Sequence, residues 1–233
     1  MQVGYSAAQV RAAEAPHLAA GEPLMQRAAD ALADELRRVL RDRRAAGAQR
    51  GARPRVLVLA GPGNNAGDAL YAGAALAADG VAVEILLALE RTHEESLSAA
   101  LAAGATVIDR GDVLESAAAA DAVVDGMFGT GSAGRSPALS GTPRDVVAAI
   151  LPLLGGPHAP TIVAVDIPSG IDADDGTVPD PVVLPADVTV TFGGMKAGLL
   201  LSPAKELAGR VVLVDIGIGD ELGKAEPILR LPD

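Results

Sequence analysis

The sequence predicts an α/β fold in which helices cover both faces of a mostly parallel β-sheet. Short apolar segments alternate with alanine-rich helical segments after residue 54, as expected for parallel strands joined by helices. Hydrophobic residues make up 49% of the 233 residues, which is enough for a sizeable core. Because no linker divides the chain, we expect one domain that spans residues 1–233.

The elements are placed from their hydrophobic spacing. Residues 7–44 predict two N-terminal helices, interrupted at Pro16 and at Gly21-Glu22-Pro23. We predict strands at residues 55–60, 82–89, 106–108, 122–126, 161–166, 187–192 and 210–215. We predict the helices between them at residues 66–78, 94–103, 113–119 and 142–154. This order is typical of a Rossmann-like three-layer α/β/α sandwich, whose sites lie at the carboxyl ends of the strands.

Composition narrows the classes of function. The chain has no cysteine, which excludes disulfides, thiolate metal sites and cysteine nucleophiles. Its formal net charge of -11 argues against nonspecific binding to nucleic acid or acidic lipid, which depends on Lys and Arg. The sequence contains no signal-peptide pattern and no run of about 18 uncharged apolar residues. We expect a cytoplasmic protein that binds neither nucleic acid nor membranes.

A glycine-rich turn follows the strand at residues 55–60. Residues 61–66 read Gly-Pro-Gly-Asn-Asn-Ala and formally match the dinucleotide fingerprint G-x-G-x-x-G/A. Asp68, however, puts a carboxylate near the position that a pyrophosphate would occupy. The side-chain oxygens of Asn64, Asn65 and Asp68 instead favour a cation or a hydroxylated ligand. The alternative is a structural helix N-cap formed by Asn64 or Asn65.

A second glycine-rich loop follows the strand at residues 122–126, in which Asp125 is the last residue but one. The loop consists of Gly129, Thr130, Gly131, Ser132, Ala133, Gly134 and Arg135. Its glycines permit close backbone approach, and Arg135 can pair with a phosphate through two hydrogen bonds. A flexible loop that Asp125 merely caps is the alternative interpretation.

A third strand, at residues 161–166, brings Asp166 to its carboxyl end and is followed by Pro168 and Ser169. Because parallel strands end at one crevice, we expect four oxygen-bearing side chains to share a site: Asn65, Asp125, Asp166 and Ser169. Such oxygens suit a weakly charged hard cation better than zinc, which prefers His or Cys. Crowded carboxylates can carry protons near neutral pH, and Asp166 is our candidate proton carrier. A plain strand-ending turn explains the Pro-Ser-Gly segment equally well.

Lys196 is one of three lysines and follows the strand at residues 187–192. It could meet a phosphate or assist proton transfer, and a solvated loop lysine is an equal alternative. His17, His93 and His158 lie outside all these segments, so we interpret them as surface or helix-face residues.

In this order, the segments resemble the NAD(P)H-hydrate epimerase family over nearly the whole chain. The matching parts are Gly21-Glu22-Pro23-Leu24-Met25, the Gly-Pro-Gly-Asn-Asn turn, the Asp125 loop, residues 165–170 and residues 191–198. The resemblance implies an isomerase that interconverts the R and S forms of hydrated NADH and NADPH (NADHX and NADPHX) at C6 of the nicotinamide ring. This metabolite repair would let a stereospecific NAD(P)H-hydrate dehydratase restore the cofactor. The family likeness also suggests a homodimer through the N-terminal helices.

The resemblance further implies residue roles. One potassium ion (K+) per subunit would be held by Asn65, Asp125 and Ser169. Substrate would contact Asp166, the catalytic residue, together with the second glycine-rich loop and the residues of the turn: Asn64, Asn65, Ala66, Gly67 and Asp68. The ion and the loop amides would allow an acidic protein to accept a dinucleotide.

Two positions depart from the family pattern, because Ala66 and Ala69 stand where the family commonly has Gly. If Ala66 must adopt a positive φ, its methyl group costs on the order of 1 kcal/mol or more. Neither change removes an acid, a base or a metal oxygen, so we expect activity to survive.

Two other classes of function stay open. The first is a non-catalytic, Rossmann-like nucleotide-binding or scaffold domain of the same fold, as in RNA-decapping proteins, which would be free to lose these oxygens. The second is a hydride-transferring dehydrogenase, which needs an acidic ribose contact. Glu90 is a poor match for that contact, because it lies beyond the usual spacing of about 20 residues after the turn.

Overall fold

A seven-stranded sheet forms the centre of the protein. The computed structural model describes residues 2–49, 51–132 and 136–232. The strands of this sheet are β2 (Arg55–Ala60), β3 (Ala82–Leu87), β4 (Thr106–Val107), β5 (Ala122–Gly126), β6 (Thr161–Val165), β7 (Val188–Phe192) and β8 (Arg210–Val214). They follow the order β4-β3-β2-β5-β6-β7-β8, and every neighbouring pair is parallel.

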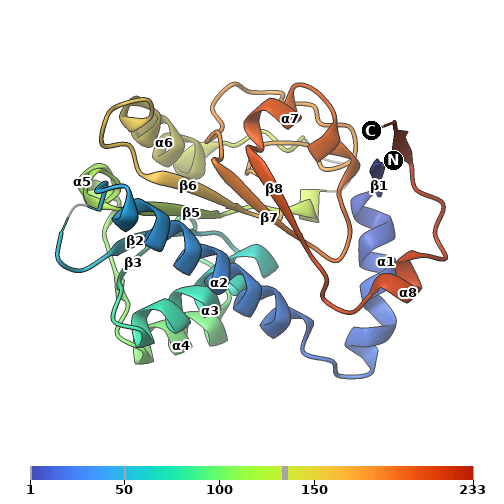
Figure 1. Ribbon diagram of the computed structural model, residues 1–233, viewed down its shortest axis with the longest axis horizontal. Helices are drawn as coiled ribbons and strands as arrows, with labels where there is room; N and C mark the ends of the chain where they lie inside the picture. Colours follow the sequence, from blue (N-terminus) through green and yellow to red (C-terminus); the bar gives the residue numbers. More distant parts are fainter. Residues whose placement is uncertain (1, 50, 133–135, 233) are drawn as a thin grey trace.

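Helices cover both faces of the sheet (Figure 1), so the predicted α/β/α fold class is confirmed. One face packs against α2 (Leu24–Ala45), α3 (Asn64–Ala78) and α4 (Glu94–Ala102), and the other against α5 (Val113–Ala119) and α6 (Gly141–Ile150). Near the chain ends lie α1 (Ala7–Ala19), α7 (Ala204–Leu207) and α8 (Gly219–Leu222). In the ranges that the structure describes, no helix is both long and apolar enough to cross a membrane. The single-domain interpretation stays a prediction.

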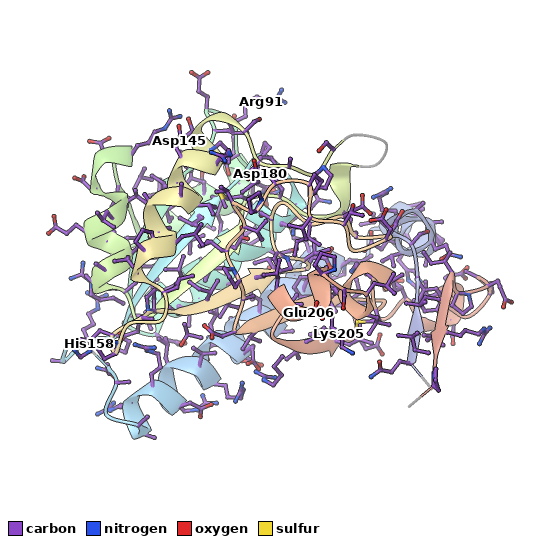
Figure 2. All side chains as sticks on the ribbon, turned by 90° about the horizontal axis from the view of Figure 1, so that it is seen from above. Arg91, Asp145, His158, Asp180, Lys205 and Glu206 are labelled. Atoms are coloured by element: carbon purple, nitrogen blue, oxygen red, sulfur yellow. The ribbon has the colours of Figure 1, made fainter. Side chains whose placement is uncertain are left out.

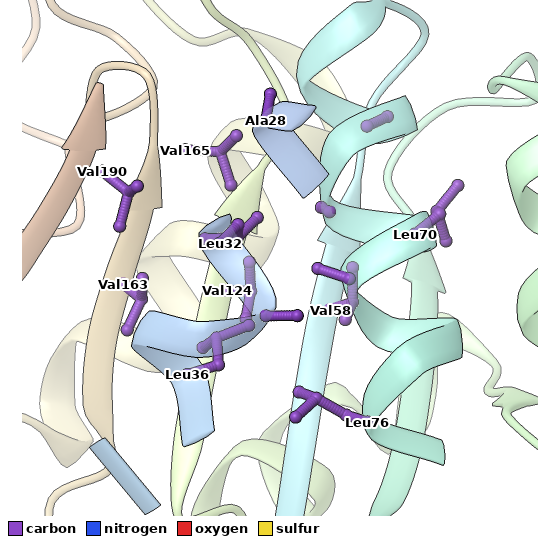
Figure 3. Packing of buried hydrophobic residues seen from close by; sticks show 14 of the residues in the cluster. Ala28, Leu32, Leu36, Val58, Leu70, Leu76, Val124, Val163, Val165 and Val190 are labelled. Carbon is purple, nitrogen blue, oxygen red and sulfur yellow. The ribbon is translucent and has the colours of Figure 1, made fainter. Parts of the chain in front are cut away.

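The alternation of side chains along each strand divides the core into two layers. Val56, Val58 and Ala60 of β2 pack toward α2 and α3, whereas Leu57 and Leu59 pack toward α5 and α6. Figure 3 shows the first layer, in which Leu32 and Leu36 of α2 lie over the valines of the strands. Both leucines are fully buried, and each such side chain contributes roughly 1.5–3 kcal/mol of hydrophobic stabilisation.

The strand order reverses direction between β2 and β5. The chain runs outward from β2 through β3 to β4, then returns to place β5 on the other side of β2. Ligands bind open α/β sheets at the carboxyl ends of the strands beside such a reversal. The register places Asp125 level with Leu59 of β2 and Ala164 of β6, so the glycine-rich turn and the second loop leave the sheet side by side.

Several predicted boundaries differ from the structure by one or two residues, and two helix predictions were wrong in larger ways. Pro16 does not interrupt the first helix, because α1 starts from a capping box between Ser6 and Gln9 and tolerates one missing donor. The helix predicted at residues 142–154 ends at Ile150, because Pro152 restricts the next turn to a 3₁₀ helix, Leu151–Leu153. Three further short 3₁₀ helices lie at Arg110–Asp112, Thr130–Ser132 and Ala197–Leu200.

A second, two-stranded sheet was not predicted. It pairs β1 (Gln2–Gly4) with β9 (Leu229–Leu231) in antiparallel register and brings the chain ends together (Figure 1). Three residues are too few to show a strand period in sequence. Just after β1, the amide of Tyr5 donates to the Met195 carbonyl at 2.8 Å, and the amide of Ala197 donates to the Tyr5 carbonyl at 2.9 Å. The N-terminal segment therefore holds the backbone on both sides of Lys196.

Candidate active site

The carboxyl ends of the central strands open onto one large cavity. Its volume is about 970 Å³, within the range of roughly 300–1,000 Å³ typical of ligand sites. Asn64, Asn65 and Asp68 line it from α3, Asp166 from the end of β6 and Lys196 from the loop after β7. Helix α1 supplies further lining with Arg11, Glu14 and Leu18, among others. The predicted crevice therefore contains three carboxylate side chains and a lysine.

The glycine-rich turn leads directly into α3. Gly63 is the N-cap residue in an extended conformation, and no side chain caps the helix, so the N-cap interpretation of Asn64 or Asn65 was wrong. Gly61 has no space for a side chain, because a Cβ atom there would lie 1.7 Å from the Met127 carbonyl oxygen. The turn after β2 and the loop after β5 thus touch through their backbones where the strand order reverses.

Ala66 and Ala69, the two alanines that depart from the family pattern, fit into α3 without strain. Ala66 lies inside α3, is fully buried and does not have a positive φ, so its methyl group carries no left-handed backbone cost. The methyl group of Ala69 fills the space beside Gly126, where an added Cβ would come within 2.7 Å of it. Both alanines belong to the core between α3 and the sheet.

Asp125 and Ser169 form a buried pair below the cavity. The Ser169 amide donates to Asp125 Oδ2 at 2.8 Å, and the Ser169 hydroxyl donates to Asp125 Oδ1 at 2.6 Å. Burial raises the pKa of Asp125, although the hydrogen bonds from Ser169 and Met127 oppose this effect. Among the described residues, no cationic side chain pairs with this carboxylate, and the side chain is fully buried.

Asn65 lies between this pair and Asp166. Its Nδ2 donates to the Val165 carbonyl at 2.5 Å, next to Asp166 in the chain. A Cβ at Gly129 would lie 2.2 Å from Asn65 Oδ1, so the glycine allows the loop after β5 to close over the amide. Ser169 also contacts this loop, because its hydroxyl accepts a hydrogen bond from the Phe128 amide at 2.9 Å.

Asp166 is held in an unusual backbone conformation and paired with Lys196. Its φ of 67° is the one positive φ of a non-glycine residue in the part of the chain that is described. Lys196 Nζ donates to Asp166 Oδ1 and to the Phe192 carbonyl, the latter at 2.8 Å. Thr191 Oγ1 also donates to Asp166 Oδ1, at 3.0 Å. With only 2% of its surface exposed, Lys196 is not a solvated loop lysine, so that alternative was wrong.

The four predicted oxygen-bearing residues therefore occupy two adjoining compartments. Asp125 follows Val123 on the strand face that packs toward α5 and α6, and it meets Ser169 there. Asp166 contacts Lys196, Thr191 and Phe192 and lines the cavity, which Asp125 and Ser169 do not. Asn65 borders both compartments.

Two further carboxylates face the Asp166–Lys196 pair. Asp68 on α3 is 7% exposed, and burial raises its pKa well above the ordinary value, with smaller contributions from Asp166 and Glu14. Burial also raises the pKa of Glu14 on α1, where Lys196 opposes the effect. Sequence reasoning missed Glu14, although it is the single acidic residue of the first helix.

The second glycine-rich loop is described only in part. Thr130 accepts a hydrogen bond from Arg11 Nη1 of α1 through its carbonyl at 2.7 Å, and Gly129, Thr130 and Gly131 line the cavity. Ser132 ends the short helix Thr130–Ser132. Ala133, Gly134 and Arg135, for which we predicted substrate contacts, lie outside the described residues.

The remaining candidates do not line this cavity. Glu90 is exposed and does not line it, which weakens the dehydrogenase interpretation. His93 caps α4 and stands edge-on to Tyr71 at a ring distance of 6.0 Å, while His17 bonds to Glu22. Figure 2 shows His158 at the end of the molecule opposite β1 and β9.

The raised pKa of Asp68 gives a test of this arrangement through stability. A carboxyl whose pKa is raised by folding binds more protons in the folded state, so stability falls as pH rises from the ordinary carboxyl range to the raised pKa. Asp68→Asn removes this loss. The variant should therefore gain stability relative to wild type as pH rises above about 4, by up to about 1.4 kcal/mol per pH unit.

Urea unfolding between pH 4 and pH 8 measures this difference. Asp220→Asn, which alters an exposed carboxylate in α8, serves as the control. Its free energy of unfolding should differ from that of the wild type by the same amount at every pH. If the difference between Asp68→Asn and the wild type is also independent of pH, the raised pKa of Asp68 in the folded protein is contradicted.

The fold and this cavity define the class: an α/β protein of Rossmann type, with a polar ligand crevice where the strand order reverses. A solved yeast structure, ynu0 (YNL200c), shares the fold with a TM-score of 0.73, covering 99% of this chain and 96% of that chain at 20% identity. More specifically, residues 21–198 match the family model described as YjeF-related protein N-terminus, and the chain belongs to that family.

Several named relatives cover most of the chain. A protein of Clavibacter michiganensis subsp. michiganensis named NAD(P)H-hydrate epimerase is 48% identical, over 97% of this chain and 95% of its own length. A protein of Microbacterium testaceum with the same name is also 48% identical, over 96% of this chain and 82% of its own length. The bifunctional NAD(P)H-hydrate repair enzyme Nnr of Mycobacterium tuberculosis is 41% identical over 92% of this chain, which matches 41% of that protein. The family resemblance expected from the sequence is confirmed.

Proposed function

We propose that this protein is an isomerase that interconverts the R and S forms of NADHX and NADPHX at C6 of the nicotinamide ring, in the repair of nicotinamide cofactors. The observation that carries the proposal is the cavity floor, where Asp166 is fixed by Lys196 and Thr191 beside the uncapped N-terminus of α3. Relatives that match nearly the whole chain bear the name of this activity.

Each part of the cavity can serve a dinucleotide. The amides at the start of α3 have no side-chain cap, and such helix ends bind phosphate. Asp166 would move a proton as the C6 carbon–oxygen bond breaks and reforms. The substrate contacts predicted for the second loop, including Arg135, are part of this proposal.

The assay combines mixed NADHX epimers with a dehydratase that consumes only the S form. The protein should accelerate consumption of the R form well beyond the rate measured without it. If the R form is consumed at the uncatalysed rate, with or without potassium, the scaffold interpretation replaces the enzyme.

A potassium ion near Asp125 is a second part of the proposal. Asp125 is a fully buried carboxylate without a cationic side-chain partner among the described residues, and a buried charge is costly unless it is compensated. Asn65, Asp125 and Ser169 would hold the ion, because amide, carboxylate and hydroxyl oxygens suit a hard, weakly charged cation. When bound, the ion would supply positive charge next to the cavity.

Potassium should accordingly stabilise the folded protein. At about ten times its dissociation constant, an ion that binds only the folded state adds about 1.4 kcal/mol. We expect potassium chloride to raise the melting temperature above that in choline chloride at equal ionic strength. Asp125→Asn should lose this difference in melting temperature. The nearby Asp121 cannot serve as a control, because it is buried and accepts a hydrogen bond from the Arg55 amide. Asp112→Asn, at an exposed site, is the matched control and should keep it. Equal melting temperatures of the wild type in the two salts would contradict the ion site.

The functional partner, the oligomeric state and the cellular location of the protein are also part of the proposal. The M. tuberculosis relative is bifunctional and this chain matches 41% of it, which supports a hydrate dehydratase as the functional partner. A homodimer through the N-terminal helices and a cytoplasmic location stay predictions. Sedimentation of the purified protein at micromolar concentration tests the dimer directly.

A further inference from the structure

Inversion at C6 through loss and re-addition of water needs two proton transfers, one to the departing oxygen and one from the attacking water, and this inference rests on the proposed function. In a route through loss of water, the C6–O bond breaks and its electron pair leaves with the oxygen, which takes a proton from an acid. The lone pair of N1 forms the C6=N1 bond. Water then adds to the other face of C6, its electron pair returns the C6=N1 pair to nitrogen, and its proton passes to a base. No oxidant or reductant is needed.

Asp166 has the arrangement of the base. Lys196 Nζ, Thr191 Oγ1 and the Phe192 amide all donate to Oδ1 of Asp166. None of the described residues donates a hydrogen bond to Oδ2, so this oxygen is available to a water in the cavity. With Oδ1 held by three donors and Oδ2 facing the cavity, Asp166 is arranged to accept a proton from water, which leaves the acid to be sought in another group.

Asp68 is the carboxyl group placed to be that acid. It projects from α3 rather than from the end of β6, lines the same cavity and is 7% exposed. No hydrogen bond or ion pair joins it to a described residue, and Lys196 is already occupied by Asp166 and the Phe192 carbonyl. Burial without a hydrogen-bond or ion-pair partner disfavours the charged form of such a carboxyl, and the neutral form can donate a proton.

The charged groups around Asp68 also favour the neutral form of its carboxyl group. Glu14 of α1 and Asp166 at the end of β6 both oppose a negative charge on Asp68, whereas Lys196 is the one group among the described residues that favours it. Arg11 of α1 acts on Glu14 and donates to the Thr130 carbonyl. Met25 of α2 and His93 at the start of α4 pack around the neighbouring Gly67, and His93 holds Ser96.

We propose that Asp68 is a second catalytic residue, the acid that protonates the departing hydroxyl, and that Glu14 is a positioning residue that keeps the proton on Asp68. The acid and the base of the reaction then come from different elements: Asp166 at the end of β6 accepts the proton and Asp68 on α3 supplies it. After one turnover the two carboxyl groups have exchanged roles, and solvent at the cavity mouth restores them.

The first experiment compares Asp68→Asn with the wild type. The amide has the same shape but cannot deliver a proton, so kcat for epimerisation should fall roughly 100-fold or more. Binding of NADH, a dinucleotide of similar shape, should change by less than about threefold if the fold is kept. An Asp68→Asn protein within about threefold of wild-type kcat would overturn the inference.

The second experiment follows the pH profile of kcat/KM. Activity should fall at high pH as Asp68 loses its proton. Removing the negative charge of Glu14 should move this alkaline limb to lower pH, so Glu14→Gln is compared with Glu115→Gln, an exposed carboxylate on α5. The Glu115 variant should keep the wild-type limb. An unchanged or upward-shifted limb in Glu14→Gln would overturn the positioning role.

A third readout does not need activity. Infrared difference spectra between wild type and Asp68→Asn at neutral pH should contain the carbonyl band of a neutral carboxylic acid. Its absence would overturn the inference even if Asp68→Asn is slow. A wild-type protein that does not epimerise NADHX overturns the proposed function instead, so the two failures are distinguishable.

Discussion

Asp166→Asn is expected to lower epimerisation of NADHX by roughly 100-fold to 10,000-fold, the range that a positioned acid–base group supplies. The substitution replaces the free carboxylate oxygen of Asp166 with an amide, which does not take a proton from water. Asn is the suitable replacement because the φ of 67° is one that Asn and Asp adopt more readily than other side chains. The rate of consumption of the R form in the dehydratase-coupled assay measures the loss.

The same substitution leaves Lys196 without its anionic partner. Breaking a buried ion pair on one side costs about 3–5 kcal/mol, so a lower melting temperature must be separated from lost chemistry. The double variant Asp166→Asn with Lys196→Met removes the unpaired charge. It should recover most of the stability and none of the activity. Normal turnover in the single variant would refute Asp166 as the proton carrier.

Gly61→Ala should be among the most destabilising single changes in the chain. The added Cβ would lie 1.7 Å from the Met127 carbonyl oxygen and 2.8 Å from the Met127 Cα, and both are backbone atoms that cannot rotate away. We expect a loss of about 3 kcal/mol or more, which corresponds to a fall in melting temperature of about 6–12 °C for a chain of this size. Epimerisation should fall with it, because the clash separates the turn after β2 from the loop after β5.

Gly63→Ala provides the matched control, two residues further along the same turn. An added Cβ there meets no atom within 4 Å, and the extended conformation of Gly63 suits any residue. Its cost should be limited to the weaker N-cap preference of Ala, at most about 1 kcal/mol. Thermal unfolding of the two variants side by side tests the claim. Equal melting temperatures would show that backbone contact at Gly61 is not what holds the two loops together.

The order and type of the elements could be predicted because they depend on local patterns. The strand at residues 55–60 and the strand at residues 122–126 were placed correctly, since their apolar runs are bounded by glycine and polar residues. Errors occurred where tertiary contacts override propensity. Pro16 stays inside α1, and the three-residue strands β1 and β9 exist because they pair with each other.

The functional residues also divide into those that local sequence predicts and those that depend on tertiary packing. Asp125 and Asp166 could be found from sequence because each lies within one residue of the end of a strand, and parallel strands end at one crevice. Glu14 could not be found, because a single carboxylate in a helix carries no periodic signal. Its position depends on how α1 packs over the cavity.

By itself, the sequence determined the alternating α/β order, the glycine-rich turn after β2 and the oxygen-bearing residues at the strand ends, because these follow from the spacing of neighbouring residues. Tertiary structure alone decided which of those oxygens meet. Strand alternation sends Asp125 to one face of the sheet to meet Ser169, while the left-handed backbone at Asp166 turns its carboxylate to Lys196, 30 residues away in the chain. Such partners are fixed by packing between distant segments, and local sequence carries no record of that packing.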